Sequence, residues 1–299
     1  MQSNQKITSM AKINLKKYRV KEKINLPELP TYEDFSLNEE ELKSELKEVS
    51  KKLADFQDVL YAHNKYSVLI CIQGMDTSGK DSLIKNVFKG FNSQGIEVHS
   101  FKSPSKKELE HDYLWRHYIA LPERGKFGIF NRTHYENVIV TRVHPEYILN
   151  ENLPKITKIE DIDEHFWKRR FKQIRKFEKN LSENGTIIFK FFLNISKEEQ
   201  KQRLLERLNN SSKNWKFSKE DLNERKLWDE YQKFYEEAIN ETYSKSAPWY
   251  VIPADNKKIA RLLVAKILWN RLKNYDNIKY PEIGNEANIE KYKEELLKS

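Results

Sequence analysis

Residues 66–82 read YSVLICIQGMDTSGKDS, and this stretch decides the fold class. Tyr66 to Ile72 is a continuous apolar run, which is typical of a strand buried on both faces of a parallel sheet. The pattern G-x-x-x-x-G-K follows at Gly74, and a helix is expected from Lys80 to Lys89. In such a loop, backbone N–H groups and the helix N-terminus surround phosphate oxygens while the lysine neutralises their charge. The stretch predicts a phosphate site, with an ordinary glycine-rich turn as the alternative.

Two acidic residues distinguish this loop from the usual pattern. Asp81 stands where a serine or threonine commonly holds Mg²⁺, and Asp76 lies inside the loop. A carboxylate repels phosphate unless a metal ion or a positioned donor lies between them, so Asp76 is interpreted as a metal ligand or as a group that orients an acceptor oxygen. The alternatives are that Asp76 caps the loop's own N–H groups and that Asp81 only favours the first helical turn.

The rest of the chain alternates between strands and helices. Strands are expected at 96–101, 128–130, 185–193 and 249–252, and helices at 38–56, 105–120, 133–143, 159–181, 196–208, 221–244 and 257–272. For the first helix, Ser36 is expected to be the N-cap, with Glu39 completing a capping box. The alternation predicts an α/β fold with a parallel sheet between helices. The expected units are an N-terminal arm (1–36), one α/β domain (37–273) and a charged tail (274–299).

Composition limits the function classes. The chain has 299 residues, and 54 Lys and Arg against 45 Asp and Glu leave a net charge of +9, which suits an anionic partner. Its one cysteine, Cys71, excludes an internal disulfide and a cysteine-based zinc site. No apolar run reaches about 18 residues, and the N-terminus lacks a signal-peptide core, so no membrane association is expected and a cytoplasmic location is predicted.

A second motif lies at FGIFNRTHYE, residues 127–136. An apolar strand that ends in a polar residue places that residue beside the phosphate loop. Here the residue is Asn131, which accepts from a metal-bound water or donates to a phosphate, and Arg132 follows it. An arginine at this position predicts a bidentate phosphate contact.

Taken together, GMDTSGKD, FNRTHYENV, LWRHYIALPERG and SKNWKFSKEDLNERKLWDEY resemble the polyphosphate kinase 2 family from about residue 30 to residue 272. Most members carry F-D-R-S-x-Y, whereas this chain has Asn131 and Thr133. The F-N-R-[ST]-H-Y-E form, with Glu136, resembles the subgroup that phosphorylates nucleoside monophosphates as well as diphosphates.

The resemblance implies a P-loop kinase-like fold with a helical lid at about 209–222 and helical terminal extensions. It implies reversible, Mg²⁺-dependent transfer (with Mn²⁺ as a substitute) from inorganic polyphosphate to nucleotides, and a homodimer or homotetramer. The metal would be held by Asp76 and Asn131. Transfer would depend on Asp76, Lys80, Arg132, Arg203 and Arg207. Nucleotide contacts are expected from Asp76, Asn131, Arg132, Glu136, Lys213 and Lys216. Polyphosphate contacts are expected from Gly74, Thr77, Ser78, Gly79, Lys80, Asp81, Ser82, Lys85, Lys89 and Arg203.

The spacing of basic residues supports parts of this scheme. Lys85 and Lys89 are four residues apart, so both lie on one face of the helix that leaves the loop. Arg203 and Arg207 have the same spacing on the helix that leads into the lid, and the alternative for them is ion pairing with Glu199 or Glu206.

Two other functions share some of these features. An ATP-dependent nucleotide kinase would have the same loop and lid, and a non-catalytic polyanion-binding protein would use the basic faces. No nucleic-acid-binding motif is recognised, so nucleic acid is not an expected partner.

Overall fold

The computed structural model describes residues 13–212, 214–282 and 286–299. Its centre is a five-stranded sheet in the order β2-β3-β1-β4-β5, and every neighbouring pair of strands is parallel. The strands are β1 (Ser67–Gln73), β2 (Ile96–Ser100), β3 (Phe127–Asn131), β4 (Thr186–Asn194) and β5 (Trp249–Pro253). The predicted α/β fold with a parallel sheet is therefore confirmed. All carboxyl ends of the strands meet at one edge, where ligands bind in folds of this kind.

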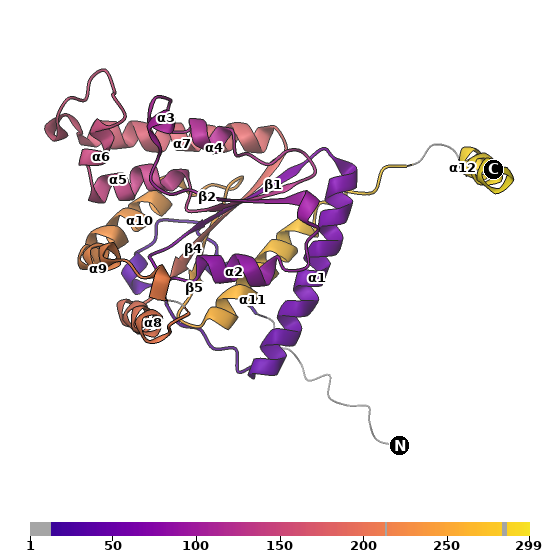
Figure 1. Cartoon of the computed structure of the whole chain (residues 1–299), viewed down its shortest axis with the longest axis horizontal. Helices are drawn as coiled ribbons and strands as arrows, with labels where there is room; N and C mark the ends of the chain where they lie inside the picture. The colour runs from indigo at the N-terminus through magenta and orange to yellow at the C-terminus, as the bar shows by residue number, and fades with distance from the viewer. Residues whose placement is uncertain (1–12, 213, 283–285) are drawn as a thin grey trace.

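Helices cover both faces of the sheet (Figure 1). One face packs against α1 (Glu39–His63), α2 (Lys80–Val87) and α11 (Lys257–Leu272). The other packs against α7 (Glu164–Glu183), α10 (Trp228–Thr242) and the short helices α4 (Trp115–Tyr118), α5 (Val140–Val143) and α6 (Glu146–Leu149). The short helix α3 (Lys106–Leu109) has no buried residue. Because side chains alternate along a strand, the apolar run of β1 supplies both cores: Ile70 and Ile72 face the first, and Leu69 and Cys71 face the second.

Several expectations about helices were wrong in detail. The helix expected at 159–181 begins only at Glu164, after a separate 3-10 turn at Ile159–Asp161, and the helix expected at 221–244 is divided at Leu227 into α9 (Lys219–Lys226) and α10.

Asn38, and not Ser36, is the N-cap of α1, because its side chain accepts from Glu40 and Glu41 and forms a capping box with Glu41. Ser36 has a left-handed backbone with φ of 54°. The helix expected at 105–120 breaks into α3 and α4, because Asp112 accepts from the backbone N–H of Leu114 and forms a turn.

The helix expected at 133–143 is also interrupted. A 3-10 helix, η4 (His134–Val138), precedes α5, and the Thr133 side chain accepts from the backbone N–H of Tyr135 at its start. The Asn137 side chain donates to the carbonyl of His134. These side-chain bonds compete with the regular α-helical pattern, so the segment directly after Asn131 forms a tight turn.

The segments that flank the sheet differ in how they pack. Within the described part of the arm, the backbone N–H of Val20 donates to the carbonyl of Trp249 at the start of β5 (2.9 Å). Helix α8 (Lys197–Asn209) precedes the segment expected to form the lid (about 209–222), and α9 (Lys219–Lys226) begins within that segment. Its role as a lid stays a prediction. Helix α12 (Glu286–Lys298) lies away from the body (Figure 1). No helix in the described ranges is long and apolar enough to cross a membrane.

Candidate active site

The phosphate loop connects the end of β1 to the first turn of α2, and its two glycines are required by geometry. Gly74 has φ of +152°, and a Cβ there would lie 2.8 Å from the Ser78 Oγ and 3.0 Å from the carbonyl oxygen of Leu193. Gly79 has φ of +104° and is the N-cap residue of α2. A side chain is strained at both positions, and a Cβ at Gly74 would also collide with its neighbours. The loop therefore has the tight, backbone-lined shape that phosphate binding needs.

Lys80 and two hydroxyl groups of the loop are hydrogen-bond donors that an anion could bind. The Lys80 ammonium donates to the carbonyls of Gly74 (2.6 Å) and Met75 (3.1 Å). Burial, together with the nearby charge of Arg132, lowers the pKa of Lys80 to about 8. The hydroxyls of Thr77 and Ser78 are buried without a hydrogen-bond partner among the described residues. Since buried polar groups are normally paired, these hydroxyls indicate a ligand with acceptor oxygens.

Asp76 forms an ion pair with Arg132 across the carboxyl edge of the sheet. The Arg132 Nη2 lies 2.9 Å from the Asp76 Oδ1, and both side chains are partly exposed. The parallel register pairs Ile72 with Asn131, which brings the loop after β3 beside the loop after β1. Arg132 has φ of 58°, a left-handed conformation that is costly for a residue with a side chain. The structure thus joins the two predicted motifs in one site.

Asn131 contacts the first turn of α2. Its Nδ2 donates to the Asp81 Oδ1 (2.7 Å) and to the Ser100 Oγ (3.3 Å), while its own Oδ1 is buried without a partner among the described residues. Asp81 therefore does more than favour a helix terminus, because it also orients Asn131. An unpaired amide oxygen next to a carboxylate is a pair of hard oxygen donors.

Arg203 lies in a different place from the one predicted. Its side chain is 3% exposed and lies under the phosphate loop. Nε donates to Glu199, Nη1 to the carbonyls of Thr77 and Ser78, and Nη2 to the carbonyls of Ala254 and Asp255. All five N–H donors of the guanidinium are thus engaged, and none remains for a phosphate. The predicted alternative, pairing with Glu199, is the one observed, and Arg203 supports the loop from below.

Arg207 lies one turn further along α8 and forms an ion pair with Asp221 of α9 (3.5 Å). The contacts expected from the other basic residues stay predictions. Lys85 and Lys89 are exposed and do not line the cavity described below. Lys213 lies outside the described residues, and the side chain of Lys216 is not described.

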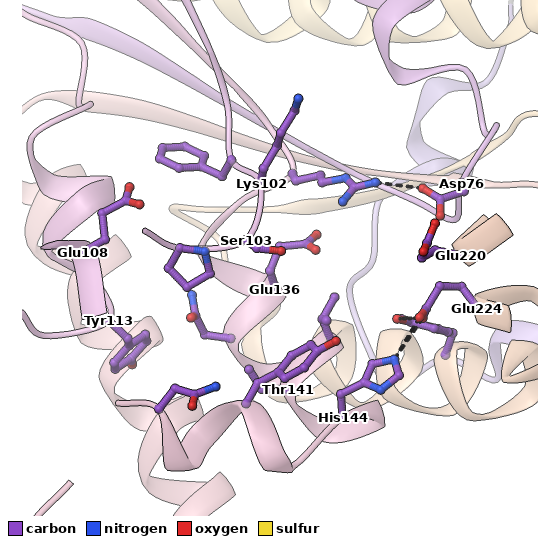
Figure 2. Close-up of a pocket in the computed structure, with 18 of the residues that line it drawn as sticks. Asp76, Lys102, Ser103, Glu108, Tyr113, Glu136, Thr141, His144, Glu220 and Glu224 are labelled. Carbon is purple, nitrogen blue, oxygen red and sulfur yellow. Dashed lines mark hydrogen bonds and ion pairs between the residues drawn. The ribbon is translucent and has the colours of Figure 1, made fainter. Parts of the chain in front are cut away.

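A cavity lies beside the loop (Figure 2), and some of the residues that line it come from the loop itself. Its volume is about 550 Å³. Asp76 lies at one side of the cavity, and Glu136 faces the cavity from η4 (Figure 2). Arg132 also lines the cavity. Burial raises the pKa of the Glu136 carboxyl, although Arg132 and Lys80 act in the opposite direction. Helix α9 closes one side, where the Glu224 Oε2 lies 3.0 Å from the His144 Nε2. The cavity has the size of a small-molecule ligand site.

Several cavity residues were missed by the sequence analysis. Tyr231 and Tyr235 of α10, Tyr113, Thr141 and His144 line the cavity. Tyr231 and Tyr235 are four residues apart, which predicts that they lie on one face of a helix. This spacing is equally typical of a helix face packed in the core, and nothing in the sequence connects the two residues to the phosphate loop. Among the described residues, no group of three or more His, Cys, Asp or Glu side chains could hold a metal ion.

Fold and site together define a P-loop phosphotransferase, with a phosphate-binding loop at one end of a nucleotide-sized cavity. The sequence profile of the family Polyphosphate kinase 2 (PPK2) matches residues 36–280, and the chain belongs to this family. It is therefore an enzyme of the family that the motifs resemble, and the polyanion-binding alternative is not supported.

Individual relatives agree with this assignment. The chain is 44% identical to an ADP-polyphosphate phosphotransferase of Rhodopseudomonas palustris, over 91% of this chain and 93% of that one. It is also 44% identical to an AMP/ADP-polyphosphate phosphotransferase of Meiothermus ruber, over 78% and 82% of the two chains. The crystal structure of polyphosphate kinase 2 from Arthrobacter aurescens TC1 superposes with a TM-score of 0.84 at 33% identity, covering 94% of this chain and 95% of that one.

Proposed function

We propose that the protein transfers a phosphoryl group from inorganic polyphosphate to nucleoside mono- and diphosphates, converting AMP to ADP and ADP to ATP reversibly. The observation that supports this most is the Asp76–Arg132 pair, which links the phosphate loop to the segment after β3 and lines the cavity. The names of the R. palustris and M. ruber relatives support the same donor and acceptors.

Each group has a role in placing and neutralising charge. The loop N–H groups, the Thr77 and Ser78 hydroxyls and Lys80 would hold the donor phosphates, with Arg132 on the side of the acceptor. Asp76 orients Arg132 and, through it, the acceptor oxygen. Phosphoryl transfer needs little covalent chemistry from a protein, so this placement supplies most of the acceleration.

The oxygen donors fit a divalent cation. Asp76, Asp81 and the unpaired Oδ1 of Asn131 would hold Mg²⁺, or Mn²⁺ in its place. Mg²⁺ is usually held by one or two carboxylates together with substrate phosphates, so a cluster of three acidic or histidine ligands is not required. When bound, the ion would neutralise the charge of the phosphates. A cytoplasmic location and assembly into a homodimer or homotetramer stay predictions from the sequence.

Acceptor range is tested directly with long-chain polyphosphate, Mg²⁺ and either AMP or ADP, following nucleotides by chromatography. The expected result is ADP and then ATP from AMP, and ATP from ADP. If only ADP is converted, the proposed acceptance of monophosphates is wrong. If polyphosphate gives no product while ATP and AMP give ADP, the protein is an ATP-dependent nucleotide kinase.

The pH dependence should report on Lys80. Its pKa of about 8 means that the ammonium loses its proton as the pH rises through this value. Only the protonated form neutralises phosphate, so kcat/KM for polyphosphate should fall by about tenfold per pH unit above about pH 8. The fall in kcat should begin at higher pH, because bound phosphate stabilises the ammonium. Initial rates over a series of polyphosphate concentrations at each pH test this, and a kcat/KM that is constant to about pH 10 would contradict it.

A further inference from the structure

Beneath the turn at residues 132–136 lies a set of buried polar side chains that the proposed chemistry does not use. We call His134, Tyr135, Glu178, Lys190 and Thr242 the buried network. Lys190 and Tyr135 have no exposed surface, and Glu178 is 2% exposed. These residues come from four elements: η4, α7, β4 and α10.

Lys190 is the centre of the buried network. Its ammonium donates to the Glu178 Oε2 (2.6 Å), to the Tyr135 hydroxyl (2.9 Å) and to the carbonyl of Thr242 (2.8 Å). An ammonium has three hydrogens, so its donors are all used. The lysine therefore ties η4 and the end of α10 to the middle of the central sheet.

Glu178 completes the attachment of η4. Its Oε1 accepts from the Tyr135 hydroxyl (2.6 Å) and lies 3.2 Å from the His134 Nε2. Burial alone would raise the pKa of the Glu178 carboxyl, but Lys190 and His134 hold the pKa below its usual range. The carboxylate is thus ionised and binds two consecutive residues of η4.

His134 and Tyr135, which Glu178 binds, lie in the sequence between the two residues of the turn that face the site. Arg132 precedes them and pairs with Asp76, and Glu136 follows them and faces the cavity. Arg132 also has the left-handed φ of 58°. A strained conformation of this kind persists only when the surrounding structure fixes it, and the buried network fixes the chain directly after it.

Stability alone does not account for this arrangement. A buried ion pair is often no more stabilising than well-packed apolar residues of the same volume, because both charges lose their hydration. We propose that the buried network positions the turn: Tyr135, bound by Lys190 and Glu178, holds Arg132 and Glu136 in the geometry that transfer requires. This inference rests on the proposed function and assigns positioning residues to it.

Tyr135→Phe tests the inference, because it removes the hydroxyl that links the turn to Lys190 and Glu178 and keeps the ring. Tyr18→Phe is the matched control, since Tyr18 is 4% exposed and its hydroxyl donates to Glu33 (2.7 Å) in the N-terminal arm. We expect Tyr135→Phe to lower kcat with AMP by about 10- to 100-fold, with KM for polyphosphate changed less than about twofold. Tyr18→Phe should lower the melting temperature by a similar amount and leave kcat unchanged.

The double variant Glu178→Met/Lys190→Met separates positioning from folding, since it replaces both buried charged groups, and their bonds to Tyr135, with apolar side chains of similar volume. We expect it to melt close to the wild type and to show the same loss of kcat as Tyr135→Phe. A wild-type kcat in either variant would overturn the inference, as would equal changes in kcat and in KM for polyphosphate. A wild-type protein without polyphosphate-dependent turnover would instead contradict the proposed function, and the inference with it.

Discussion

Asp76→Asn is expected to lower the rate of ADP formation from AMP and polyphosphate by about 10²- to 10³-fold, the usual effect of removing one preorganised electrostatic group. The substitution keeps the shape of the side chain and removes its charge. Arg132, which lies 2.9 Å from the Asp76 carboxylate, then loses the partner that orients it toward the acceptor. A metal ion held by Asp76 would lose a ligand by the same change.

The fold should not be affected. Asp76 and Arg132 are partly exposed, and ion pairs at such positions contribute about 0–1 kcal/mol to stability. Thermal melting should therefore stay close to that of the wild type, and Asp76→Ala should behave in the same way. Asp55→Asn is a suitable control, because Asp55 is exposed on α1 and does not line the cavity. Turnover retained in Asp76→Asn with a normal melting curve would exclude the proposed role.

The part of this site that the sequence predicts is the part made by consecutive residues. The apolar run of β1 predicts a buried strand, and the glycines that follow it predict a tight turn with positive φ at Gly79. Strand and turn can both be predicted because each depends only on neighbouring residues. Asn131 was predicted beside the loop because parallel strands end at a common edge, and its contact with Asp81 confirms that neighbourhood.

The residues and contacts that the sequence analysis missed depend on which elements pack together in the fold or on specific side-chain hydrogen bonds. Patterns of neighbouring residues do not predict either. Tyr235 reaches the cavity because α10 packs across the sheet, which requires the tertiary fold. The break between η4 and α5 follows from side-chain bonds of Thr133 and Asn137, whereas the apolar residues of the segment are compatible with a continuous helix. Lys190 lies within the apolar strand β4, and the sequence does not show its partners because they come from three other elements.

Arg203 and Arg207 show the same limit, and they lead to the second large expected effect. Spacing places both on one side of α8, but it does not tell which of them faces substrate. In the structure Arg203 binds the loop carbonyls of Thr77 and Ser78 from below, whereas Arg207 extends toward α9. Replacing Arg203 should therefore affect mainly stability and polyphosphate binding, whereas replacing Arg207 should affect mainly kcat.

Arg203→Ala is expected to lower the free energy of unfolding by about 3–5 kcal/mol, because it leaves Glu199 and four carbonyls without their buried donor. It should also raise KM for polyphosphate, since the loop carbonyls lose the group that fixes them. Arg203→Lys should recover little, because one ammonium cannot replace a planar group with five donors. Urea denaturation and steady-state kinetics measure the two effects.

Arg207→Ala provides the contrast. The Arg207 side chain is 26% exposed, compared with 3% for Arg203, so its loss should lower the free energy of unfolding by less than the loss of Arg203 does. If Arg207 neutralises transferring oxygens when α9 closes on the cavity, kcat should fall by about 10²- to 10³-fold. If the Arg203→Ala variant is stable and has a reduced kcat with an unchanged KM for polyphosphate, the structural role of Arg203 is wrong. Arg203 would then have the charge-neutralising role that its spacing suggests. A normal kcat in Arg207→Ala would remove that role from Arg207.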